Sequence, residues 1–308
     1  MKAFRLTAVL ACVLAIFAVQ AGFAQAENNA VSRETSWCYP DFEIFGSWVY
    51  QYDRDNPGND NGIRLNKSWL ILNQELSDST KVVVFLGLEG QNMLVHDFRI
   101  HWNPRVPYVD DVVAGRFAPP FGYEYQSIRY DFLPTVFYSG INDSLIARDN
   151  GVRVDIGYRW AKLNLGLFAG DQRTGGFVEE RKDNKLHAYQ RLSLDLPYGF
   201  TAGASYRYAR TRNDLIGFDA NWVHYDTEVT FEAMRFDGEN QWYLLFCQVV
   251  APRIQAVVRY ENLPYGNRFI PGVKVELDNA DIKFNHVLSG EKDGENIFLG
   301  QMVVYFDW

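Results

Sequence analysis

Residues 297–308 read IFLGQMVVYFDW and run to the last position of the chain. Successive side chains of a β-strand point to opposite sides, so one side of this segment carries only apolar residues and glycine. That row consists of Phe298, Gly300, Met302, Val304, Phe306 and Trp308. An amphipathic, aromatic strand at the end of a chain is suited to pairing with the first strand and closing a barrel. The alternative is the terminal strand of a secreted β-sandwich.

Alternation of the same kind recurs from Asp41 to the end of the chain. The alternating segments are separated by Gly, Pro, Asn and Asp, which favour turns. Clear examples are residues 42–52, 152–160, 163–169, 186–196, 202–208, 227–233, 254–260 and 273–277. The pattern predicts an all-β chain of about sixteen strands, with fourteen as the alternative.

Composition bears on what the apolar face of each strand meets. The 308 residues are 47% hydrophobic and 16% aromatic, with a formal charge of −8. A transmembrane barrel needs aromatic girdles, and its strands are too short for the ~20-residue apolar run of a membrane helix. A soluble sandwich of this length would usually divide into domains, and no linker-like break is present. We therefore predict a transmembrane antiparallel up-and-down β-barrel over residues 41–308. The acidic balance argues against a nucleic-acid partner.

The N-terminus has the pattern of a secretory signal peptide. Lys2 and Arg5 precede an apolar run over residues 6–23, and residues 24–26 read AQA, a small-x-small cleavage site. We predict a signal peptide over residues 1–26 and a periplasmic lead-in over residues 27–40. Export fits the segment at the opposite end of the chain, which resembles the C-terminal signature of bacterial outer-membrane β-barrels. That resemblance implies an outer-membrane location, and a role for Phe306 and Trp308 in recognition by the barrel-assembly machinery.

Connection lengths support an up-and-down order. With both termini in the periplasm, every second connection is periplasmic and should be tight. The expected tight connections are 77–80, 160–161, 197–199, 225–227, 251–253 and 278–280, with a somewhat longer one at 103–108. The expected longer, external connections are 53–61, 118–147, 171–183 and 262–268.

Residues 112–124 read VVAGRFAPPFGYE, which resembles a stretch of the phosphate-selective porin O/P family. Residues 65–88 and the segment RDNGV at 148–152 resemble the same family more loosely. The resemblance implies a sixteen-stranded outer-membrane barrel, a homotrimer, and passage of small anions such as phosphate.

Pro119 and Pro120 cannot donate ladder hydrogen bonds, so the strand before them must end. Residues 118–147 then form a loop far longer than typical connections and rich in aromatic residues. We predict that this loop folds into the barrel and narrows a pore; the alternative is an external loop packed on its neighbours.

A pore selects solutes by the groups that line it. The candidate pore-lining and constriction residues are Arg99, Arg116, Arg129, Arg153, Arg159, Arg191, Arg207, Tyr123 and Glu124. Carboxylates on the same predicted faces are about as numerous as the cations, which departs from the arginine-rich lumen that the resemblance implies. Neighbours such as Arg153 and Asp155 have a simpler interpretation as ion pairs that stiffen the wall.

Enzyme motifs are missing from the sequence. The five histidines form no HExxH, and no GxSxG nucleophile motif occurs. We therefore expect no catalytic residues, no metal and no cofactor. The favoured function is passive diffusion of small hydrophilic solutes or ions through a barrel surrounded by outer-membrane lipid. A non-conducting structural barrel is the first alternative, and an outer-membrane hydrolase, whose triad the fold would assemble, is the second.

Overall fold

A computed structural model describes residues 41–53, 62–89, 92–124, 133–136, 139, 147–169, 171–174, 181–182, 186–209, 214–236, 238–290 and 296–307. Residues 40–308 form one compact unit, to which the following account refers. The predicted signal peptide, the lead-in and Trp308 lie outside the described residues.

Sixteen long strands, counted over the described residues, make up the wall. They are β1 (Asp41–Asp53), β2 (Gly62–Ser77), β3 (Thr80–Glu89), β4 (Asn92–Trp102), β5 (Val109–Phe117), β6 (Ala147–Tyr158), β7 (Ala161–Phe168), β10 (His187–Leu196), β11 (Phe200–Ala209), β12 (Leu215–His224), β13 (Thr227–Phe236), β14 (Glu239–Ala251), β15 (Ile254–Leu263), β16 (Gly266–Leu277), β17 (Ala280–Ser289) and β18 (Asn296–Asp307). Two short strands, β8 (Asp171–Thr174) and β9 (Arg181–Lys182), lie in the connection between β7 and β10.

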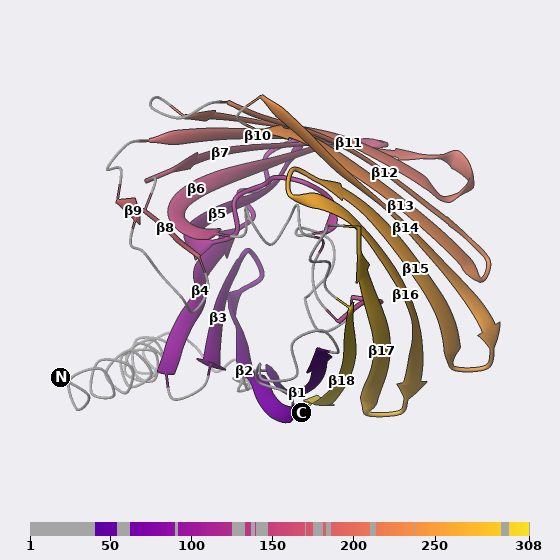
Figure 1. The fold of residues 1–308 in the computed structure, drawn as a ribbon. Coiled ribbons are helices and arrows are strands. Elements are labelled where there is room, and N and C mark those ends of the chain that lie inside the picture. The colour runs from indigo at the N-terminus through magenta and orange to yellow at the C-terminus, as the bar shows by residue number, and fades with distance from the viewer. Residues whose placement is uncertain are drawn as a thin grey trace. The chain divides into compact units, whose positions relative to one another are not determined.

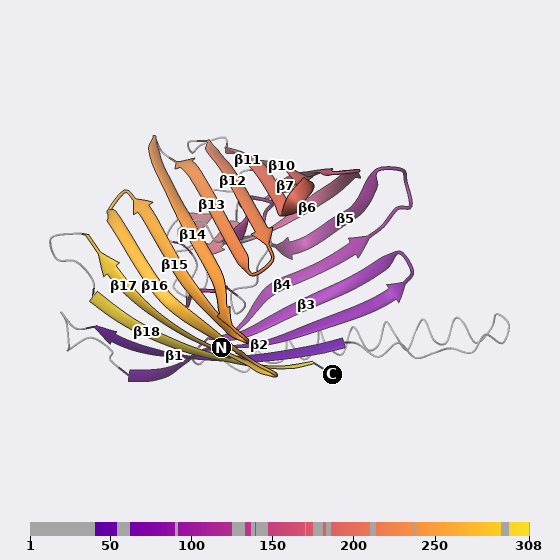
Figure 2. The same ribbon diagram turned by 90° about the vertical axis from the view of Figure 1, so that its right-hand side faces the viewer.

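Every wall strand pairs antiparallel with the next, and the last pairs with the first (Figures 1 and 2). At the closing seam Trp48 lies opposite Met302 and Tyr52 opposite Phe298, over eleven successive residue pairs. The ring confirms the predicted all-β, up-and-down barrel with sixteen strands rather than fourteen. No helix in the described part of the chain has the length and apolarity to cross a membrane.

The two faces of the wall differ as the alternation predicts. On β18, Phe298 and Met302 are 45% and 41% exposed, whereas Leu299, Gln301 and Val303 are buried. Large apolar side chains are exposed on the same side of the other strands, which we call the outer face. The opposite, inner face carries most of the buried polar side chains. The row quoted from residues 298–304 thus lies on the outer face.

The connections that the sequence predicts to be tight are short in the structure, and these predicted connections all belong to one end of the barrel. At the other end one prediction is wrong: residues 262–268 do not form a long loop. Leu263 pairs with Gly266, so only Pro264 and Tyr265 separate β15 from β16. Gly266 has φ of +136°, a conformation that glycine adopts readily and that lets the chain reverse early.

Gly115 on β5 lies where β4 approaches closely. Its φ is +132°, and a Cβ there would collide with the backbone carbonyl oxygen of Phe98. We expect Gly115→Ala to destabilise the barrel by about 1–3 kcal/mol, because backbone must move and the conformation is strained. Urea unfolding in lipid vesicles measures the loss. Gly300→Ala is the matched control, since the nearest atom to its new Cβ would be 3.6 Å away; equal stability of the two variants would contradict the prediction.

Candidate lumen and constriction loop

The inner face of the wall carries ion pairs, and both partners of the Arg191–Asp219 pair are buried. The guanidinium of Arg191 (β10) donates from Nη1 and Nη2 to the two carboxylate oxygens of Asp219 (β12), at 2.6 and 2.9 Å. Arg191 also donates to Ser205 Oγ on the strand between them (2.9 Å). On β6, Arg153 Nε lies 2.7 Å from Asp155 Oδ1, as the sequence suggested for this pair. These contacts neutralise lumen charges within the wall.

Four of the predicted pore-lining arginines lie on the inner face: Arg99, Arg153, Arg191 and Arg207. Arg99 is 3.7 Å from Asp97, and the guanidinium of Arg207 lies 5.6 Å from the centre of the Phe236 ring. Both are therefore engaged with the wall. Their placement agrees with the alternation from which they were predicted.

Arg116 and Arg159 were placed wrongly by the sequence. Arg116 pairs with Phe98 and shares the outer face with it, whereas its neighbour Phe117 is fully buried on the inner face. A charged residue near the end of a strand can lie on the outer face because its long side chain reaches toward water. Arg159 is in the β6–β7 turn with φ of 53°, and its guanidinium lies over the Tyr158 ring at 5.2 Å.

Arg129 lies outside the described residues. Phe306 lies within β18, opposite Ile44 in the closing seam. The two other predicted site residues, Tyr123 and Glu124, lie in the first part of the loop that follows β5.

That loop enters the lumen directly after the two prolines. The Gly122 N–H donates to Ser205 Oγ on β11 (3.1 Å). Phe121 packs against Gly217 of β12, where an added Cβ would come within 2.8 Å of the ring. The loop therefore makes its first contacts with the inner face at the Ser205 hydroxyl and at Gly217.

Glu232 of β13 is the main anchor of this first part. One carboxylate oxygen accepts the Tyr123 N–H (3.2 Å), and the other accepts the Glu124 N–H (3.3 Å) and the Tyr243 hydroxyl (3.0 Å). Glu232 is 1% exposed. Burial, followed by the charges of Glu228 and Asp219, raises the pKa of the Tyr123 phenol to about 12. Tyr123 is therefore neutral at physiological pH and adds no charge to the lumen.

The second described part of the loop reaches strands farther round the ring. Arg259 of β15 donates from Nη1 to Thr135 Oγ1 (2.7 Å), and the Val136 N–H donates to Asn285 Oδ1 of β17 (2.7 Å). Within the loop, Ser139 donates its N–H and its hydroxyl to Glu124 Oε2, at 3.0 and 2.8 Å. The loop thus bonds to inner-face side chains from β11 to β17.

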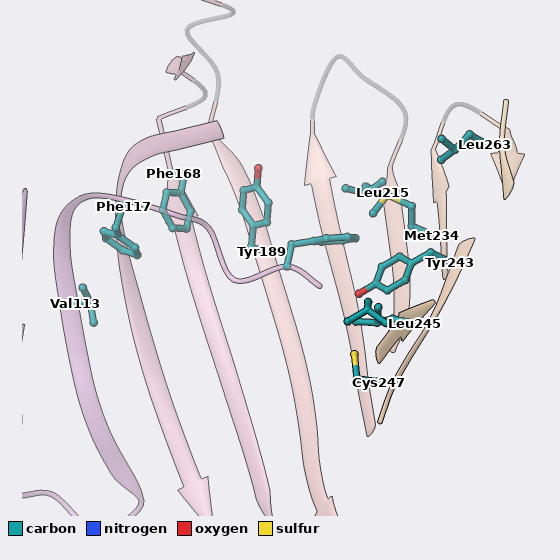
Figure 3. Close-up of a cluster of buried hydrophobic side chains, with 12 residues drawn as sticks. Val113, Phe117, Phe168, Tyr189, Leu215, Met234, Tyr243, Leu245, Cys247 and Leu263 are labelled. Atoms are coloured by element: carbon teal, nitrogen blue, oxygen red, sulfur yellow. The ribbon is translucent and has the colours of Figure 1, made fainter. Parts of the chain in front are cut away.

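An apolar cluster on the inner face supports the loop. Figure 3 shows Phe117, Phe168 and Tyr189 on one side of the cluster, and Leu215, Tyr243 and Leu245 on the other. Phe121 of the loop belongs to the same cluster. The inner face is apolar rather than polar at this place, because the wall packs against an inserted segment that includes Phe121.

Comparisons with solved structures place this architecture among known barrels. A loop-deletion variant of OmpT, an outer membrane protein of Vibrio cholerae, aligns over 87% of this chain and 99% of its own, with TM-score 0.59 and 10% identity. A variant of the porin of Rhodopseudomonas blastica aligns over 87% and 100%, with TM-score 0.58 and 10% identity. No protein-family model matches the sequence, and no curated protein matches it either.

The chain therefore has the fold of porin-like outer-membrane β-barrels. Identity of this order shows the fold alone. The assignment to the phosphate-selective porin O/P family stays a prediction from the motif.

Proposed function

We propose that this protein is an outer-membrane channel for passive diffusion of small hydrophilic solutes, narrowed by the loop of residues 118–147. The observation that carries the proposal is the set of hydrogen bonds that joins this loop to inner-face residues of β11, β13, β15 and β17. Long loops that are ordered usually have a function. The exposed apolar outer face suits contact with lipid, and the fold is shared with porins.

The proposal has four further parts. The signal peptide exports the chain, and the terminal segment is read by the assembly machinery. The function is non-enzymatic and needs no cofactor. Homotrimer formation follows from the family resemblance. We do not extend the proposal to phosphate selectivity, because inner-face arginines such as Arg191 and Arg153 are paired with carboxylates.

Planar-bilayer recording of the purified, refolded protein tests the proposal. Stable conductance steps are expected, and reversal potentials in a salt gradient then give the ion preference. A bilayer that stays silent at every protein concentration would favour the non-conducting structural barrel instead. The observation that favours this second candidate is the packing of the loop against inner-face residues of β11, β13, β15 and β17, because a loop held in this way can also close the lumen.

A further inference from the structure

A cavity of about 190 Å³ lies between the second part of the loop and the inner face of the wall. Thr135 and Val136 line it from the loop, and the remaining lining residues come from β1, β15, β16, β17 and β18. Pockets for drug-sized ligands measure about 300–1,000 Å³, so this cavity suits a molecule of only a few heavy atoms.

One part of the cavity lining is cationic. Among the residues that line it, the charged ones are both arginines, Arg259 and Arg268. Arg259 is 3% exposed and is held in place by Glu261 Oε1 at 2.9 Å from its Nε, and by Thr135. Arg268 lies with its guanidinium 5.2 Å from the centre of the Tyr265 ring. Arg259 Nη1 also lies 3.5 Å from Glu124 Oε1, and neither Glu124 nor Glu261 is among the residues that line the cavity, so the charged groups of the lining itself are the two guanidiniums.

Asn285 adds a donor to the same lining. Its Oδ1 accepts the Val136 N–H, so the orientation of the amide is fixed and Nδ2 remains a donor. Asn285 is 3% exposed, and its Nδ2 has no hydrogen-bond partner among the described residues. A buried donor of this kind costs free energy unless a ligand or water accepts from it.

The rest of the lining is mainly apolar. Ile270, Val287 and Leu299 belong to one cluster of buried hydrophobic side chains on β16, β17 and β18. The cavity therefore combines cationic and amide donors with a hydrocarbon surface. Inorganic anions would use only the first of these.

We propose that this cavity binds a small organic carboxylate with a short hydrocarbon chain. The carboxylate accepts hydrogen bonds from Arg268, Arg259 and Asn285, and the chain packs on Ile270, Val287 and Leu299. The inference rests on the proposed channel, since the ligand reaches the cavity through the lumen. It names a class of solute that binds in this cavity while it passes through the channel.

Butyrate is the probe, and isothermal titration calorimetry of the full-length mature protein in detergent is the measurement. Wild type is expected to bind butyrate more tightly than phosphate, and to bind butylammonium not at all. Arg268→Gln should weaken butyrate binding about tenfold or more, because one charge-assisted contact is lost. Asn285→Asp should weaken it at least as much: it keeps the acceptor for Val136 but replaces the Nδ2 donor with a carboxylate oxygen.

Arg253→Gln is the matched control. It also removes one arginine charge, from an exposed turn between β14 and β15 where Arg253 pairs with Asp278 at 2.7 Å. Unchanged butyrate affinity in this variant, with loss in the other two, supports the site. Absent butyrate binding in wild type, equal affinity in Arg268→Gln, or tighter binding of phosphate would overturn it. Calorimetry does not require conduction: binding without conductance steps would contradict the proposed channel alone, and conductance without binding would contradict the site alone.

Discussion

Glu232→Leu is expected to release the loop from the wall and to raise the single-channel conductance. The carboxylate of Glu232 accepts hydrogen bonds from two loop N–H groups and from the Tyr243 hydroxyl. Leucine fills similar space but accepts none, and each buried donor left without an acceptor costs about 1–3 kcal/mol. A loss of about 3 kcal/mol shifts the balance between seated and released loop by roughly two orders of magnitude. Planar-bilayer recording should show larger steps and more open-channel noise than in wild type.

Two further variants make this test specific. Glu232→Gln keeps one acceptor oxygen, so its conductance should lie between those of wild type and Glu232→Leu. Glu239→Leu removes a carboxylate from an exposed position at the start of β14 and should leave conductance unchanged. If Glu232→Leu conducts as wild type does, Glu232 does not hold the loop in the pore.

The barrel was predictable because its signals are local. The side of the strand on which Phe298 and Met302 lie can be inferred from the apolar residues two positions away on the same side. Sixteen such segments, many of them joined by tight turns, define an up-and-down order. The loop was predictable in outline for a similar reason, because Pro119 and Pro120 end a strand and no strand pattern follows for many residues.

The partners of the loop could not be predicted, because barrel closure brings them together. Tyr123 and Glu232 are 109 residues apart, and Val136 and Asn285 are 149 apart. Ser205 and Asn285 are also uncharged, so nothing in the sequence distinguishes them from other polar residues of the wall. For Arg116, charge led to a wrong prediction. Its charge suggested the inner face, but strand register places it on the outer face.

β14 is an exception to the pattern of polar inner faces and apolar outer faces. Its outer face carries Leu244 and Phe246, and its inner face carries Tyr243 and Leu245. Such a strand, apolar on both sides, is expected where one side meets lipid and the other meets an inserted segment. An apolar inner face is therefore a sequence signal for the seat of a loop, which could be sought before a structure is known.

Arg191→Leu should destabilise the barrel more than any other charge removal discussed above. It would leave the Asp219 carboxylate, now held by two hydrogen bonds at 2.6 and 2.9 Å, buried without its cation. Breaking a buried ion pair by removing one partner costs about 3–5 kcal/mol. Urea unfolding in lipid vesicles, followed by tryptophan fluorescence, measures this loss. Lys162→Leu is the control, because Lys162 and Asp195 form an exposed pair at 3.6 Å, and such pairs contribute about 0–1 kcal/mol.

The double variant Arg191→Leu/Asp219→Leu separates two explanations for that loss. If the uncompensated charge is the cause, replacing both partners by leucine should recover most of the stability, because two apolar side chains can pack where the pair lay. Gly203 lies between the two partners, and a Cβ there would touch both the Asp219 carboxylate and the Arg191 guanidinium. The pair thus occupies space that a glycine leaves open, and leucines of similar volume can fill it. A double variant as unstable as Arg191→Leu alone would show instead that the hydrogen-bond geometry itself, including the contact with Ser205, holds β10, β11 and β12 in register.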